Sequence, residues 1–177
     1  AQADPLPFSD FPVKDQQQEA AFSFVLDTSG TVKGTPLSGI KTAASALIKL
    51  LDDTNSVAVL TFDDEIRTLA VFTRKKSKIL GQIAELKTSG NKTVLFDALL
   101  KALADIEKRE QAKKFILLFS DGKDEGSTAD LDRVIEKARQ AHVPIFSIGY
   151  SKIEKTFLAT LEELASKTGG SFVFRSE

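Results

Sequence analysis

Short, almost uninterrupted apolar runs recur along this chain, and segments with helical periodicity separate them. Residues 22–26, 115–119 and 143–149 are such runs, and they lack the strict polar–apolar alternation of a strand with one solvated face. Strands buried on both faces have this pattern, and they occur in parallel sheets that helices cover. The sequence therefore predicts an α/β fold.

The whole pattern predicts six strands and five helices. The expected strands span residues 22–26, 56–62, 66–73, 115–119, 143–149 and 171–174. Helical spacing of apolar residues appears in 37–51, 79–86, 95–106, 131–138 and 157–165. Only residues 63–65 join the second strand to the third, and so short a link permits only antiparallel pairing. The expected fold class is a doubly wound, mostly parallel six-stranded sheet with one antiparallel edge strand and helices on both faces.

A length of 177 residues predicts a single domain. Residues 1–19 hold three of the five prolines and a run of three glutamines, without periodicity, and are interpreted as a leader segment. Residues 20–177 are expected to form the domain. The chain reaches residue 177 soon after the sixth expected strand.

Composition excludes several chemistries. The chain has no Cys, so it has no disulfide, thiolate nucleophile or Cys-based zinc site, and the one His, His142, cannot form a His-rich metal centre. A formal net charge of −1 gives no reason to expect nucleic acid as a partner. No apolar stretch has the length of a membrane span.

Oxygen-bearing side chains follow two of the expected strands. Asp27 closes the first strand, and Ser29 and Thr31 follow it at alternate positions; Asp121 closes the fourth strand. Ligands in such folds bind at the carboxyl ends of strands where the strand order reverses. A set of oxygen donors suits a hard cation such as Mg²⁺ or Mn²⁺. The alternative is an ordinary strand-to-helix turn, which uses the same residue types.

Three segments carry a resemblance to a known family. They read FVLDTSGTVKG at residues 24–34, SGNKTVLFDALLKAL at 89–103 and FILLFSDGKDE at 115–125. In this order, and each at an element boundary, they resemble the von Willebrand factor type A family. That family carries a metal-ion-dependent adhesion site written D-x-S-x-S, followed by a separate Thr and a separate Asp. The resemblance extends from about residue 20 to 174.

The resemblance implies a metal site rather than a catalytic one. Its expected ligands are Asp27, Ser29, Thr31, Thr93 and Asp121, holding Mg²⁺, with Mn²⁺ and Ca²⁺ as alternatives. A protein partner is expected to complete the coordination with an Asp or Glu carboxylate. The domain is expected to be monomeric and to act in adhesion or another protein interaction. The family's final helix has no counterpart within these residues.

The expected location is secreted, periplasmic or at the cell surface, which the absence of Cys permits. The absence of Cys suits the cytoplasm equally, so that alternative stays open.

One residue departs from the family pattern. Thr31 stands where the family usually has Ser; the hydroxyl is kept, but the added methyl stiffens the side chain and crowds the site. Other acidic residues nearby are interpreted as turn, helix-start and solvated loop charges: Asp63, Asp64, Asp97, Asp124 and Glu125. The alternative for Asp63 and Asp64 is a place on the rim of the site, and the alternative for the other three is a supporting role behind the metal ligands.

Two other functions compete with the metal-dependent one. A phosphatase of the haloacid dehalogenase type has D-x-D-x-T after its first strand, but Ser29 replaces the second acid, which serves as general acid and base. A metal-free interaction scaffold, or a subunit of a larger assembly, is the remaining alternative.

Overall fold

The computed structural model describes residues 19–150 and 156–175. The strands are β1 (Ala20–Asp27), β2 (Ser56–Phe62), β3 (Ile66–Thr73), β4 (Lys113–Ser120), β5 (Ile145–Tyr150) and β6 (Phe172–Arg175). The helices are the 3₁₀ turn η2 (Gly30–Val32) and α1 (Thr35–Leu50), α2 (Lys76–Ala84), α3 (Leu95–Glu107), α4 (Leu131–Gln140) and α5 (Leu158–Thr168). Apart from Glu19, the expected leader lies outside the described residues.

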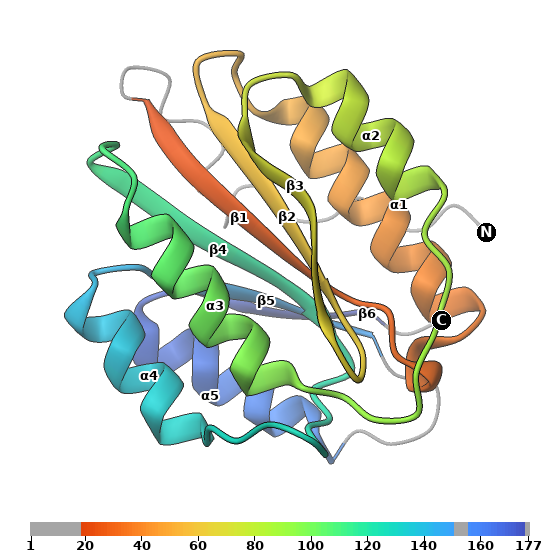
Figure 1. The fold of residues 1–177 in the computed structure, drawn as a ribbon. Coiled ribbons are helices and arrows are strands. Elements are labelled where there is room, and N and C mark those ends of the chain that lie inside the picture. The colour runs from red at the N-terminus through yellow and green to blue at the C-terminus, as the bar shows by residue number, and fades with distance from the viewer. Residues whose placement is uncertain (1–18, 151–155, 176–177) are drawn as a thin grey trace.

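The strands form one sheet in the order β3-β2-β1-β4-β5-β6 (Figure 1). β3 pairs antiparallel with β2, and all other neighbours are parallel. The predicted fold class is confirmed. The chain proceeds from β1 to β2 and β3 on one side, and β4 to β6 lie on the other side. The strand order therefore reverses between β1 and β4, where this architecture binds ligands.

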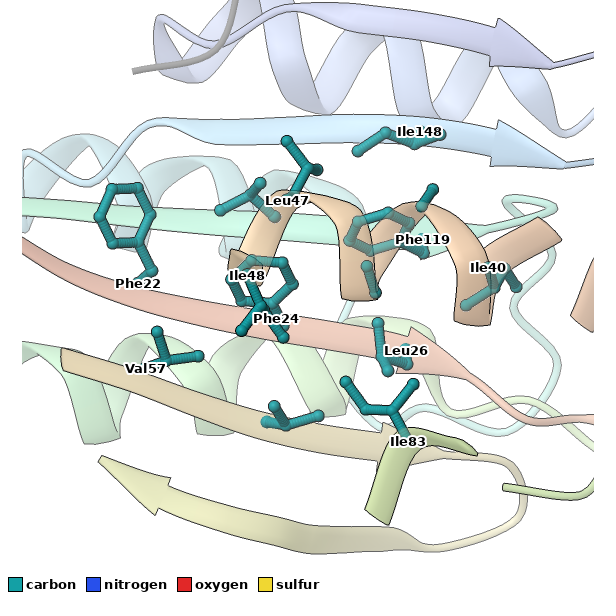
Figure 2. Close-up of a cluster of buried hydrophobic side chains, with 14 of the residues drawn as sticks. Phe22, Phe24, Leu26, Ile40, Leu47, Ile48, Val57, Ile83, Phe119 and Ile148 are labelled. Carbon is teal, nitrogen blue, oxygen red and sulfur yellow. The ribbon is translucent and has the colours of Figure 1, made fainter. Parts of the chain in front are cut away.

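Helices cover both faces of the sheet, with α1 and α2 on one face and α3, α4 and α5 on the other (Figure 1). On the first face, the rings of Phe24 and Phe119 stack with centroids 6.0 Å apart, and Ile40, Leu47 and Ile48 of α1 pack nearby (Figure 2). Every residue of β1 is buried. This central strand is held by a core on each side, so its carboxyl end is a rigid place for a binding site.

The observed strand bounds differ slightly from the expected ones. β1 begins at Ala20, two residues earlier than expected, and β5 begins at Ile145 rather than at residue 143. Pro144 has no N–H for the ladder, and the Val143 N–H donates to the carbonyl of Ala138 at the end of α4. Among the described residues, no helix is long and apolar enough to cross a bilayer.

Candidate metal site

The carboxyl end of β1 carries a chain of linked oxygen atoms. Asp27 is fully buried, and its Oδ1 accepts hydrogen bonds from Ser29 N at 2.9 Å and from Ser29 Oγ at 2.6 Å. Ser29 Oγ lies 2.9 Å from Thr31 Oγ1. The alternate spacing of these residues thus brings one carboxylate and two hydroxyls together. Ser29 is buried and Thr31 is exposed, so the chain of oxygens leads from the interior to the surface.

The end of β4 adjoins the same carboxylate. Ser120 is buried, and its Oγ donates to Asp27 Oδ2 at 2.7 Å while accepting from the N–H of Gly122 at 3.0 Å. The next residue, Asp121, is half-buried, and its Oδ1 accepts from the N–H of Lys123 at 3.0 Å. The sequence interpretation missed Ser120. The one available signal was its position directly before Asp121, at the end of a buried strand.

Burial disfavours the charged form of Asp27. Loss of hydration and, after it, the neighbouring charge of Asp121 raise the pKa of Asp27 from 3.8 to about 7. Hydrogen bonds from Ser29 and Ser120 oppose that rise without cancelling it. A bound cation is the kind of group that favours an ionised carboxylate in such a place. The electrostatics of the two acids therefore suit a positive ligand.

Thr93 reaches the same region from a separate loop. Its main-chain carbonyl accepts from the N–H groups of Glu125 and Gly126, at 2.9 and 3.1 Å, which joins its loop to the segment after β4. The N–H of Ser89 donates to the carbonyl of Thr28 at 2.9 Å, which joins the same loop to the end of β1. The loop that carries Thr93 is thus bonded to both strand ends that supply the acids.

The hydroxyl of Thr93 has no internal partner. Thr93 is fully buried, and its Oγ1 makes no hydrogen bond to any described residue. Five other buried side-chain atoms of the described chain share this state, but none belongs to the loops at the carboxyl ends of β1 and β4. A buried hydroxyl without a partner costs about 1–3 kcal/mol. A cation that binds from solution, and that the hydroxyl oxygen coordinates, would explain this position.

Close backbone contacts fix the loops around these side chains. A Cβ added at Gly30 would lie 3.3 Å from the carbonyl oxygen of Gly90, so the two loops nearly touch there. Gly122 has a φ of +86°, and a Cβ on it would lie 2.2 Å from the carbonyl oxygen of Phe157. A side chain at Gly122 is excluded by both conformation and space.

The other acids near these loops are more structured than the sequence indicated. Asp63 is fully buried and accepts from Arg67, Ser89 and the N–H of Glu65. Asp97 accepts from the N–H groups of Thr128 and Ala129, at 2.9 and 3.0 Å, so it holds the segment before α4.

Asp124 caps the first turn of α3. Its Oδ1 accepts from the N–H of Phe96 at 3.2 Å and from Ser127 Oγ at 2.6 Å. The interpretation of Asp63 and Asp124 as simple turn and loop charges was incomplete. Besides its local partners, Asp63 bonds to Ser89 across 26 residues and Asp124 bonds to Phe96 across 28, and local patterns carry no information on such contacts.

The donor set limits which cation can fit. Within residues 19–150 and 156–175, no three His, Cys, Asp or Glu side chains gather where they could hold a metal. Any site here therefore depends on hydroxyls beside its carboxylates. Such a set fits Mg²⁺ or Mn²⁺ and gives a soft metal nothing to bind. The buried, unpartnered hydroxyl of Thr93 is consistent with this group of ligands.

Comparisons with known proteins identify the family and the fold. The sequence pattern of the family described as von Willebrand factor type A domain matches residues 23–177. Mouse integrin alpha-M is 22% identical over 169 residues, which cover 90% of this chain and 15% of the integrin. The chain thus spans a small part of that relative's length.

Two solved structures have the same fold. One is a von Willebrand factor type A structure from Catenulispora acidiphila, with a TM-score of 0.76, 21% identity, and coverage of 90% of this chain and 39% of that one. The other holds three N-terminal domains of the type V pili tip protein Mfa5 from Porphyromonas gingivalis. It has a TM-score of 0.73, 12% identity, and coverage of 88% of this chain and 46% of that one.

Proposed function

The chain belongs to the von Willebrand factor type A domain family, and on that premise we propose that it is a divalent-cation-dependent protein-binding module. The preferred cation is Mg²⁺, and its ligands are Asp27, Ser29, Thr31, Thr93 and Asp121. It supplies a Lewis-acidic position that an acidic group of another protein can occupy. The domain acts as an adhesion or interaction unit and performs no catalysis.

The observation that carries this proposal is the unpartnered hydroxyl of Thr93. An ordinary strand-to-helix turn explains Asp27, Ser29 and Thr31, because their side chains bond one another. It gives no reason to bury Thr93 Oγ1 without a partner. A cation shared by Thr93 and Asp27 explains both the orphan hydroxyl and the buried carboxylate.

The charge of the ligand set supports a carboxylate partner. Three of the five proposed ligands are neutral hydroxyls, and the two acids are Asp27 and Asp121. Neutral hydroxyls leave part of the cation's charge unbalanced, and Mg²⁺ requires six oxygens. An Asp or Glu from another protein adds both an oxygen and a negative charge, which makes a charge-assisted contact.

The test is calorimetric titration of Mg²⁺ into the wild type and into Thr93→Val. Val has the shape of Thr without the hydroxyl, so the metal-free fold is kept or slightly stabilised. We expect metal affinity to fall at least tenfold, which is about 1.4 kcal/mol.

Ser56→Ala is the matched control. Ser56 is also buried with an unpartnered hydroxyl, but it begins β2, six residues before Phe62, the register partner of Asp27. We expect Mg²⁺ affinity unchanged in this variant. Absence of Mg²⁺ binding by the wild type would favour the metal-free scaffold instead.

Partner binding is tested by capture from source-cell extract on the immobilised domain. Proteins retained by the wild type with Mg²⁺, and lost with EDTA or with Thr93→Val, are the expected class. A partner retained equally under all three conditions contradicts the metal-dependent function.

A phosphatase function is disfavoured by the contacts of Ser29. Its hydroxyl donates to Asp27 at 2.6 Å, in the place where a phosphatase of the dehalogenase type has its general acid. Turnover of a generic aryl phosphate that Asp27→Asn abolishes would overturn this assignment.

The proposed location is secreted, periplasmic or at the cell surface. The structural likeness to a pili tip protein supports it, and the cytoplasm is the alternative. Fractionation of the source cells with an antibody to the domain tests it.

A further inference from the structure

The loop that carries Thr93 is hydrogen-bonded to the turn between β2 and β3. The side chain of Asp64, although exposed, accepts hydrogen bonds from two main-chain N–H groups of that loop: from Asn91 at 2.8 Å and from Lys92. These two residues directly precede Thr93. The carboxylate of Asp64 therefore fixes the backbone that leads into the proposed ligand.

Asp63 fixes the same loop at two further points. Its Oδ2 accepts from Ser89 Oγ, and its main-chain carbonyl accepts from the N–H of Val94 at 3.0 Å. Ser89 and Val94 lie on either side of Thr93. The loop is thus held before and after the ligand by one turn of the chain.

The remaining bonds of Asp63 make the turn itself rigid. Arg67 Nη1 donates to Asp63 Oδ2 at 2.6 Å, and the N–H of Glu65 donates to Oδ1 at 3.0 Å. Asp63 is fully buried, and although burial opposes ionisation, the bonds from Ser89 and Arg67 lower its pKa. The acid is therefore charged near neutral pH, when its bonds to the loop are strongest.

Packing leaves little room between the turn and the loop. Gly90 has a φ of +73°, and a Cβ added there would lie 2.9 Å from Asp64 Oδ1 and 3.0 Å from the Cβ of Asp63. The turn thus contacts the loop on both sides of Thr93, from Ser89 to Lys92 and again at Val94.

From these contacts we infer that Asp63 and Asp64 are positioning residues for metal binding: the β2–β3 turn sets the affinity of the site by holding Thr93 in place. This inference rests on the proposed function. Neither acid is itself a proposed ligand, and both act through the loop of residues 89–94. Partners that orient metal ligands in this way typically change metal affinity by about 10–100-fold when removed.

The experiment measures Mg²⁺ affinity by calorimetry in Asp64→Ala, with Glu65→Ala as the matched control. Both changes remove one negative charge from the same turn, but the side chain of Glu65 bonds to Arg67 and not to the loop. We expect Asp64→Ala to weaken Mg²⁺ binding roughly tenfold, at the lower end of that range. We expect Glu65→Ala to change it by less than about twofold, since exposed charges have weak long-range effects.

A double-mutant cycle distinguishes positioning from a general loss of stability. In the Thr93→Val background, Asp64→Ala should have almost no further effect on metal affinity, because the ligand it positions is already gone. A merely structural role of Asp64 lowers the melting temperature in EDTA but gives no such coupling. An equal loss of affinity in both backgrounds overturns the inference.

Ser89 provides a second and milder test. Ser89→Ala removes the hydroxyl that bonds to Asp63 and keeps the N–H bond to Thr28, whereas Ser89→Thr keeps both. We expect weaker Mg²⁺ binding in Ser89→Ala and wild-type binding in Ser89→Thr. Wild-type affinity in Ser89→Ala would count against the positioning role of Asp63.

The two proposals fail in different ways. If the wild type binds Mg²⁺ and Thr93→Val weakens binding, while Asp64→Ala matches Glu65→Ala, the positioning role is wrong and the proposed function stands. If the wild type binds no Mg²⁺, both are wrong.

Discussion

Replacing Asp27 with Asn separates the stability of the metal-free domain from its response to metal. The substitution keeps the shape of the side chain and removes its charge. A pKa raised from 3.8 to about 7 corresponds to about 4 kcal/mol of destabilisation when Asp27 is ionised in the folded, metal-free protein. Asn can still accept from Ser29, but it presents an amide nitrogen to one of its neighbours. We therefore expect a net gain of about 1–3 kcal/mol above pH 7, below that ceiling.

The dependence on pH follows from the sign of the shift. Because the pKa of Asp27 is higher in the folded state than in the unfolded state, the wild type loses stability as pH rises from about 4 to about 7. Asp27→Asn has no such loss. The advantage of the variant should be absent near pH 4, grow through this interval, and stay constant above it.

Urea denaturation in EDTA at pH 5 and pH 8, followed by circular dichroism, measures these differences. A repeat at pH 8 with millimolar Mg²⁺ should stabilise the wild type and leave Asp27→Asn unchanged. A variant less stable than the wild type in EDTA at pH 8, or equal stabilisation of both proteins by Mg²⁺, would contradict a destabilising buried charge on Asp27 that a cation relieves.

Two further substitutions test other parts of the site. Thr31→Ser keeps the hydroxyl and removes the methyl that stiffens and crowds the site, so we expect Mg²⁺ affinity to rise by roughly two- to fivefold in calorimetry; unchanged or weaker binding contradicts the crowding argument. Asp63→Asn weakens the bonds to Arg67 and Ser89, and should lower the free energy of unfolding by about 1–3 kcal/mol at pH 7. Because the pKa of Asp63 is lowered in the folded state, this difference should shrink as pH falls below about 4, and a difference independent of pH in urea denaturation would argue against it.

The fold was predictable from the sequence because its strands are buried on both faces. Phe22, Phe24 and Leu26 face one helical layer while Ala21 and Val25 face the other, so the whole run is apolar. The short link of residues 63–65 likewise predicted the antiparallel pairing of β3. Strand ends were less predictable, since Pro144 and the last turn of α4 decide where β5 begins.

Part of the candidate site was predictable from residue spacing and from the ends of the expected strands. Asp27, Ser29 and Thr31 form a local pattern, and their mutual hydrogen bonds follow from that spacing. Asp121 followed from its place at the end of the fourth expected strand, and Thr93 entered through the family resemblance.

The roles of Ser120 and Asp63 depend on contacts that no local pattern encodes. Ser120 bonds to a residue 93 positions away, and Asp63 bonds to Ser89 across 26 positions. Ser at a strand end and Asp in a turn are common, so their residue types alone gave no reason to single them out.

A crystal structure of the domain with millimolar Mn²⁺, with anomalous data collected for manganese, would show whether a cation binds at the carboxyl end of β1. We expect one strong anomalous peak among the oxygens of Asp27, Ser29 and Thr93, with Thr93 Oγ1 directed at the metal. No peak there, with the hydroxyl of Thr93 still unpartnered or bonded to water, would contradict the assignment of a metal-dependent site.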